Sequence, residues 1–179
     1  GGMRQRCVLA IALALNPHIL FADEPTTALD VTVQAQMLDL LRDIQRKTGI
    51  GIVLVSHDLG VVARIADRVA VMYAGNIVEY AATGQLLKHP SHPYTRALLK
   101  AVPHLGGDGK RLSTIPGHVP SADDFAPGCR FSDRCERFET LSEAEREQCR
   151  NCIPGRTEPE NGHFVRCFHP FPAERDALG

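Results

Sequence analysis

The sequence predicts an α/β fold with a mainly parallel sheet, followed by a small, irregular, cysteine-rich C-terminal domain. Two short apolar runs, residues 19–22 and residues 50–55, have the length and composition of strands that are buried on both faces. Patterns of helical spacing precede the first run and separate it from the second. This alternation of helices and strands is typical of a sheet with helical crossovers, which makes neighbouring strands parallel.

Helical spacing of apolar residues predicts one helix over residues 4–15, which an Asn-Pro step ends. Cys7 lies among the apolar residues of this helix, and we interpret it as a small buried hydrophobic residue. A second helix is predicted over residues 31–47; the side chain of Asp30 can cap its N-terminus, and Gly49 is expected to close it. Its apolar stripe is expected to pack in the core.

Two adjacent carboxylates, Asp23 and Glu24, follow the first apolar run directly, and Pro25 then ends the strand. Ligands of α/β proteins bind at the carboxyl ends of strands. One carboxylate can hold a magnesium ion while the other polarises an attacking water, so the pair suits phosphoryl transfer. Solvated turn residues are the alternative interpretation.

A histidine, His57, follows the second apolar run. It lies at the same sheet edge as Glu24 if the two strands are parallel. A neutral imidazole in that place can hydrogen-bond a γ-phosphate or the attacking water. The sequence therefore predicts that His57 and the acid pair belong to one site.

Four segments in this order and spacing resemble the ATPase subunit of an ABC transporter. The segments are Gly1-Gly2-Met3-Arg4-Gln5-Arg6, Asp23-Glu24, Thr27-Ala28-Leu29-Asp30 and Ser56-His57-Asp58. The resemblance implies the C-terminal part of a P-loop NTPase domain that binds ATP and magnesium. In such a domain, Asp23 would be the Walker B magnesium carboxylate, Glu24 the general base and His57 the switch histidine.

The same resemblance implies a dimer of ATPase subunits, either homomeric or made of two related chains. Gly1 and Gly2 would end the signature motif and meet the γ-phosphate bound by the other subunit, because glycines at a helix start allow close approach of a phosphate. Asp30 would be the D-loop acid, in contact across the dimer.

A Gly-rich phosphate loop is also implied, and this sequence does not contain one. The nearest candidate, residues 106–111, lacks the required spacing and places Arg111 where a hydroxyl should bind magnesium, so we interpret it as a flexible linker. We expect the phosphate loop upstream, which would make the chain the C-terminal part of a longer protein. The chain alone should neither bind ATP tightly nor hydrolyse it.

The segment after the ATPase part indicates a transporter subtype. A helix is predicted over residues 59–66, and a hairpin over residues 68–80. Residues 89–99 closely resemble the segment that follows the ATPase core in oligopeptide and dipeptide importers. His89 and His92 in this run are interpreted as structural. We expect an ATPase part over residues 1–84, a helical connection over residues 85–105 and an importer-type, cysteine-rich C-terminal domain over residues 106–179.

Five of the six cysteines lie in this C-terminal region: Cys129, Cys135, Cys149, Cys152 and Cys167. A reducing cytoplasm disfavours disulfides, so a metal ion or cluster is the natural interpretation of so many thiols. Residues 115–120 and 128–135 resemble the tail domain of the same importers, in which four cysteines hold a 4Fe-4S cluster in several members. By that resemblance the ligands are Cys129, Cys135, Cys149 and Cys167, with Cys152 as the alternative to Cys149.

The cysteine spacings match neither the common iron-sulfur signature nor the common zinc signature. Zinc and unliganded thiols therefore stay open as alternatives to the cluster. The acidic, helix-like residues 142–148 look like an insertion between the second and third ligands. His163 and His169 flank Cys167, and we interpret them as loop histidines rather than ligands.

The 179 residues carry a formal net charge of −1, which gives no indication of a nucleic-acid partner. No apolar run approaches the roughly 20 residues of a membrane span. The resemblance implies an ATP-hydrolysing subunit of an importer for di- or oligopeptides or similar solutes, peripheral to the cytoplasmic face of the cell (inner) membrane. Its partners would be membrane permease subunits, a second ATPase subunit and, indirectly, a solute-binding protein. An ABC ATPase of nucleic-acid maintenance and a metal-binding or permease-docking module stay open as alternatives.

Overall fold

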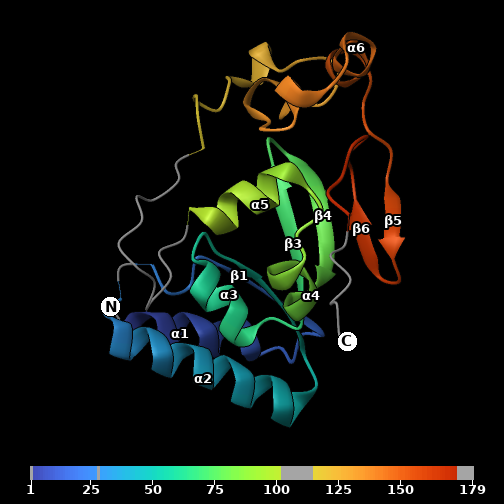
Figure 1. The fold of residues 1–179 in the computed structure, drawn as a ribbon. Helices are drawn as coiled ribbons and strands as arrows, with labels where there is room; N and C mark the ends of the chain where they lie inside the picture. The colour runs from blue at the N-terminus through green and yellow to red at the C-terminus, as the bar shows by residue number, and fades with distance from the viewer. Residues whose placement is uncertain (1, 28, 102–114, 173–179) are drawn as a thin grey trace, which may run out of the picture. The chain divides into compact units, whose positions relative to one another are not determined.

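The computed structural model describes residues 2–27, 29–101 and 115–172, and Figure 1 shows its helices and strands. The chain forms two compact units, Gly1–Ala66 and Asp67–Gly179. Residues 106–111, the predicted linker, lie outside the described residues. No helix within the described ranges is both long and apolar enough to cross a membrane.

The first unit is an α/β unit with two parallel strands. Its elements are α1 (Gly2–Leu13), β1 (Ile19–Asp23), α2 (Val31–Thr48), β2 (Gly51–Val55) and α3 (Leu59–Ile65). Strand β1 pairs with β2 in parallel register, with Leu20 opposite Ile52 and Asp23 opposite Val55. The core of this unit is built from Leu20, Leu41 and Ile50, against which residues of α1, α2 and α3 pack. The predicted parallel pairing and the predicted helices are present.

Helix α2 has the predicted ends. The side chain of Asp30 accepts a hydrogen bond from the backbone of Val33 at 2.9 Å, which satisfies one free amide of the first turn. Gly49 ends the helix in the left-handed region, at φ 71°, and its amide donates to the carbonyl of Gln45. A residue without a side chain adopts that conformation at little cost.

Helix α1 differs from the prediction at Cys7. The Cys7 side chain is exposed, and α1 has no fully buried residue among its twelve. Leu9 and Leu13 are the α1 residues that pack against the core, so Cys7 lies on a different face of the helix. The interpretation of Cys7 as a buried residue was therefore wrong.

The second unit contains a four-stranded antiparallel sheet and short helices. Its strands are β3 (Arg68–Tyr73), β4 (Asn76–Ala82), β5 (Thr157–Glu160) and β6 (His163–Val165), in the order β3-β4-β6-β5. Its helices are α4 (Thr83–Lys88), α5 (Pro93–Lys100) and α6 (Glu143–Asn151), with 3-10 turns at Ala122–Asp124, Ser132–Arg134 and Phe138–Thr140. A mainly parallel sheet is therefore wrong for the described strands, of which only β1 and β2 pair in parallel.

Short turns explain the antiparallel sheet. Ala74 and Gly75 alone connect β3 to β4, and a two-residue connection can join only antiparallel neighbours. Residues 161–162 connect β5 to β6 in the same way. Strand β6 also pairs with β4, with Val165 opposite Glu79. The two compact units meet in the chain at Ala66 and Asp67. The domain boundaries predicted at residues 84 and 105 stay a prediction.

Candidate functional site

The carboxyl edge of the parallel strands brings Glu24 and His57 into contact. The Glu24 amide donates to the carbonyl of Val55 at 2.9 Å, which continues the β1–β2 pairing by one residue. Beyond that point, Oε1 of Glu24 lies 2.6 Å from Nδ1 of His57. The two side chains are 33 positions apart in the chain, and the parallel register is what places them together.

Glu24 is held in an uncommon conformation. Its φ is 46°, in the left-handed region that non-glycine residues rarely adopt. The Thr27 hydroxyl donates to Oε2 of the same carboxylate. Hydrogen bonds from His57 first, and then from Thr27, lower the pKa of Glu24, while the Glu24 carboxylate raises the pKa of His57. The site therefore presents an ionised carboxylate whose two oxygens are oriented by neighbouring side chains.

The other predicted nucleotide-site residues lie at the ends of elements. Asp23 is the last residue of β1, and it is exposed. Asp30 caps α2 and has a complete structural role there. Gly2 begins α1, where an added Cβ would lie 2.6 Å from Cγ1 of Val33. Gly1 lies outside the described residues, so its role and those of Asp23, Asp30 and Gly2 stay predictions.

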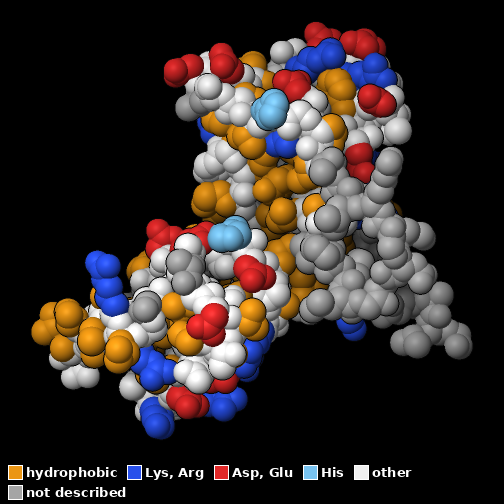
Figure 2. Space-filling model, turned by 90° about the vertical axis from the view of Figure 1, so that its left-hand side faces the viewer, with side chains coloured by type: hydrophobic (Ala, Val, Ile, Leu, Met, Phe, Trp, Pro, Cys, Tyr) orange, Lys and Arg blue, Asp and Glu red, His pale blue; other side chains and the backbone are white. Residues whose placement is uncertain are grey.

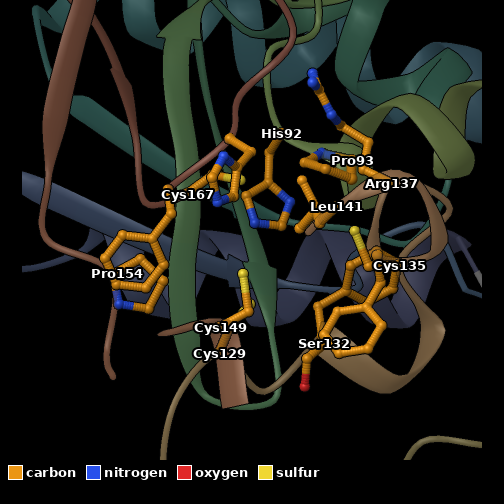
Figure 3. A pocket seen from close by; sticks show the side chains of 14 residues that line it. His92, Pro93, Cys129, Ser132, Cys135, Arg137, Leu141, Cys149, Pro154 and Cys167 are labelled. Atoms are coloured by element: carbon orange, nitrogen blue, oxygen red, sulfur yellow. The ribbon is translucent and has the colours of Figure 1, made fainter. Parts of the chain in front are cut away.

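The second unit places four cysteines around one pocket. Its lining includes Cys129, Cys135, Cys149 and Cys167, as well as His92 and His169. In Figure 3 the His92 ring projects into the space between the labelled cysteine side chains. Cys152 is exposed and does not line the pocket. The structure thus brings together the four cysteines predicted as ligands and leaves the alternative outside.

Backbone contacts bring the first and third of these cysteines together. The Cys129 amide donates to the Cys149 carbonyl at 2.8 Å, and the Gly128 amide donates to the Arg150 carbonyl at 3.0 Å. A Cβ on Gly128 would lie 2.5 Å from the Cys149 carbonyl oxygen, so this approach requires glycine. The predicted acidic helix carries Cys149 as α6, which begins with a capping box of Ser142 and Glu145.

Backbone amides donate hydrogen bonds to three of the cysteine sulfurs. The Cys129 sulfur accepts from the amides two and three positions later, and Cys135 has the same arrangement. Cys167 accepts from the amide of His169. Burial nevertheless raises the pKa of each thiol, to about 12 for Cys167, because a thiolate loses its hydration in the pocket. A bound cation would reverse that balance, and the amides are in place to stabilise the resulting thiolates.

The free volume of the pocket is about 20 Å³, enough for about one water molecule. Within the described ranges, no three His, Cys, Asp or Glu side chains are gathered closely enough to hold a single metal ion. Tetrahedral zinc would require sulfurs about 3.8 Å apart, since each lies about 2.3 Å from the ion. Four thiols around one pocket are the donor set that an iron-sulfur cluster requires, and a pocket of this volume must open to admit one.

Substitution of Gly128 should disturb the pocket more than that of another glycine in the same region. We expect Gly128→Ala to lower the free energy of unfolding by about 1–3 kcal/mol, because the new methyl group meets backbone that cannot move aside. Gly155→Ala is the matched control, since nothing lies within 4 Å of its added Cβ. Urea unfolding of both variants measures the difference. Equal stability of the two would contradict the close packing of residues 128 and 149.

Comparison with known proteins shows what this chain resembles. The family described as "Oligopeptide/dipeptide transporter, C-terminal region" matches residues 78–140. An oligopeptide transport ATP-binding protein, AppD, and a dipeptide transport ATP-binding protein, DppD, both of Bacillus subtilis strain 168, are each 48% identical over 168 residues. The match covers 94% of this chain and 49% and 48% of those proteins. The oligopeptide transport ATP-binding protein OppD of Haemophilus influenzae is 47% identical and is covered to 50%.

The acid pair and histidine at the edge of a parallel sheet, together with these relatives, define part of an ABC ATPase. Within that class, 94% of the chain is similar to ATP-binding proteins of oligopeptide and dipeptide transport. It spans about half the length of the curated relatives it matches.

Four features of the second unit were not predicted from the sequence. Glu79 is a buried carboxylate, His163 lies in strand β6 rather than in a loop, and the two side chains are in contact. Gly128 owes its importance to residues about twenty positions away. In the sequence, the sign of the buried carboxylate is an acid within a mostly apolar run, residues 77–82.

Proposed function

We propose that this chain is part of the ATP-hydrolysing subunit of an ABC importer that energises the uptake of di- or oligopeptides. The contact between Glu24 and His57 at the ends of two parallel strands carries the proposal, because it orients a carboxylate where a nucleotide phosphate binds in α/β proteins. The identity to peptide-transport ATP-binding proteins supports the choice of solute.

In the proposed reaction, water attacks the γ-phosphate and the bond to the β-phosphate oxygen breaks, which releases ADP and phosphate. Glu24 accepts the proton of the attacking water, and its lowered pKa keeps the carboxylate ionised and ready for that role. His57 holds Glu24 through Nδ1 and can present its other nitrogen to the γ-phosphate. Asp23 would hold the magnesium ion that neutralises the phosphate oxygens.

The proposed subunit acts in a dimer and with a membrane permease. Gly1, Gly2 and Asp30 would complete the nucleotide site of a second ATPase subunit, and a solute-binding protein would contribute indirectly. Binding of ATP would then close the dimer and hydrolysis would reopen it, which converts binding energy into movement of the permease. The subunit would lie on the cytoplasmic face of the cell membrane without crossing it.

The first unit leaves an apolar face of its sheet uncovered. Ile19 and Phe21 of β1 are 55% and 73% exposed, and Val53 and Val55 of β2 are 43% and 50% exposed. Figure 2 shows hydrophobic side chains at the surface among charged ones. Sheets of parallel strands are normally covered on both faces. This exposed face supports the expectation that the ATPase requires more chain than these residues, including a phosphate loop, and that the chain alone is inactive.

For the C-terminal region, we propose a 4Fe-4S cluster held by Cys129, Cys135, Cys149 and Cys167. The single observation that favours it is that these four thiols line one pocket while backbone amides point at three of the sulfurs. Among the described residues no three of these thiols are gathered closely enough to hold a single ion, so zinc, the alternative, would require the sulfurs to come together. Such a cluster would supply a compact, redox-active cross-link between segments of the region.

Transport by a complete ATPase subunit that includes these residues tests the proposed function. With its permease and binding protein in proteoliposomes, we expect ATP-dependent accumulation of a labelled oligopeptide, and ATP hydrolysis that rises when the peptide is supplied. Asp23→Asn should abolish both, since the magnesium ion would lose its carboxylate. ATP hydrolysis that responds to no peptide, or that persists in Asp23→Asn, would overturn the proposal.

A further inference from the structure

A buried carboxylate in the second unit has no part in the proposed ATPase chemistry. Glu79 of β4 is 1% exposed. Its Oε1 accepts from the Ser91 amide at 2.6 Å and from Nε2 of His163 at 2.7 Å, and its Oε2 accepts from the His92 amide at 3.0 Å. A buried carboxylate is stable only when it is hydrogen-bonded in this way. Glu79 therefore fixes the start of α5 and strand β6 to β4.

The backbone that Glu79 holds carries the imidazole of His92, which is 1% exposed and lines the cysteine pocket. Its Nδ1 accepts from the Tyr94 amide at 3.0 Å, so the ring proton is on Nε2. That nitrogen donates to the backbone carbonyl of Arg166. Burial lowers the pKa of His92 to about 4, so the ring is neutral near pH 7. With both nitrogens engaged, His92 is not free to bind a metal.

The peptide that receives this hydrogen bond leads directly into Cys167. The Arg166 amide donates to the Val78 carbonyl of β4 at 2.9 Å, while the Arg166 carbonyl accepts from His92. The peptide units on both sides of Arg166 are thus held, one by the sheet and one by the histidine. Cys167 is the next residue, and its sulfur lies in the pocket with the other three thiols.

We propose that Glu79 and His92 are positioning residues for Cys167, which hold its sulfur in the cysteine pocket before any metal arrives. This inference deepens the proposed metal centre and rests on it for its biological purpose. Neither residue is a ligand: Glu79 orients the His92 backbone, and His92 orients the Arg166–Cys167 peptide. Preorganisation of the fourth thiol reduces the ordering that metal binding would otherwise require. The same hydrogen bonds link the cysteine pocket to the start of α5 and to strand β4.

Alkylation of the metal-free chain tests the positioning directly, without reference to a cluster. The rate at which iodoacetamide modifies Cys167 is measured by peptide mass spectrometry and divided by the rate for Cys152, which is exposed. His92→Asn keeps an acceptor for the Tyr94 amide but is too short to reach the Arg166 carbonyl. We expect His92→Asn to raise the ratio of the Cys167 rate to the Cys152 rate about fivefold to tenfold, the factor that corresponds to the loss of one buried hydrogen bond.

His92→Gln provides the matched control, because its side-chain amide can reach the Arg166 carbonyl in the place of Nε2. We expect this variant to stay within about twofold of the native ratio, since the hydrogen bond to the peptide before Cys167 is retained. Glu79→Gln should behave like His92→Asn, because an amide nitrogen cannot accept from the backbone that Glu79 holds.

Three results would overturn the positioning role. They are an unchanged Cys167 ratio in His92→Asn, equal ratios in His92→Asn and His92→Gln, and an equal rise for Cys129 and Cys167, which would indicate general loosening. Iron and sulfide content after reconstitution is measured on the same variants and should fall where Cys167 becomes reactive. A native chain that takes up no iron would refute the cluster alone, because the alkylation rates are measured without metal.

Discussion

Replacement of Glu24 by glutamine should leave ATP binding intact and lower ATP hydrolysis by a factor of about 10²–10⁴ in a complete ATPase subunit that includes these residues. The amide keeps the size of the carboxylate and its contact with Thr27, but it cannot accept the proton of the attacking water. Nucleotide affinity and steady-state phosphate release, measured on the same preparation, separate binding from chemistry.

A second measurement on Glu24→Gln tests the contact between Glu24 and His57. The Glu24 carboxylate favours the protonated imidazole and so raises the pKa of His57, which means that His57 should titrate at a lower pH in the variant. Histidine resonances followed by NMR across pH 5–9 would show the shift. Asp39→Asn, on the exposed face of α2 where Asp39 pairs with Arg64, is the control and should change neither hydrolysis nor the His57 titration. Undiminished hydrolysis in Glu24→Gln would reject the general-base role.

Substitution of Cys149 should remove the proposed cluster, whereas substitution of Cys152 should not. After anaerobic reconstitution, we expect about four irons and four sulfides per chain in the native protein and in Cys152→Ser, and far fewer in Cys149→Ser. The reason is position: Cys149 lines the pocket with the other three thiols, and Cys152, one turn of backbone later, is exposed. Serine is close in size to cysteine, so the comparison tests the ligand rather than the packing.

Other metal contents would discriminate among the remaining alternatives. If the native chain contains zinc, and Cys149→Ser loses it while Cys152→Ser does not, the four proposed ligands are correct and they bind zinc instead of a cluster. Retention of iron in Cys149→Ser with its loss in Cys152→Ser would reverse the assignment of the third ligand. Neither iron nor zinc in any preparation would leave the four thiols unliganded and would reject the proposed centre.

Much of the ATPase part could be predicted from the sequence because its signals are local. The apolar runs that become β1 and β2 are read from neighbouring residues, and so are the cap at Asp30 and the glycine that ends α2. The contact between Glu24 and His57 followed from one further rule, since residues after parallel strands share a sheet edge. The capping box of α6 has the same local origin.

The interpretation of Cys7 as buried shows where local reasoning stops. Apolar neighbours predict that a residue lies in a helix, but not which face of that helix meets the core. In α1 that face is defined by Leu9 and Leu13, which pack against the core cluster of the first unit, so Cys7 stays exposed. The antiparallel sheet has a similar explanation, because the pairing of β6 with β4 joins residues more than eighty positions apart.

The sequence by itself determined the class of the protein. Short segments are enough to recognise the acid pair, the histidine, the helix caps and the thiol-rich C-terminal region. Only the tertiary structure decided which thiols share a pocket, why Gly128 must be glycine, and how Glu79 and His92 reach the peptide before Cys167. The physical reason is sequence separation. Each of these features is a contact between segments whose spacing along the chain carries no periodic signal, so it exists only once the sheet and its turns have formed.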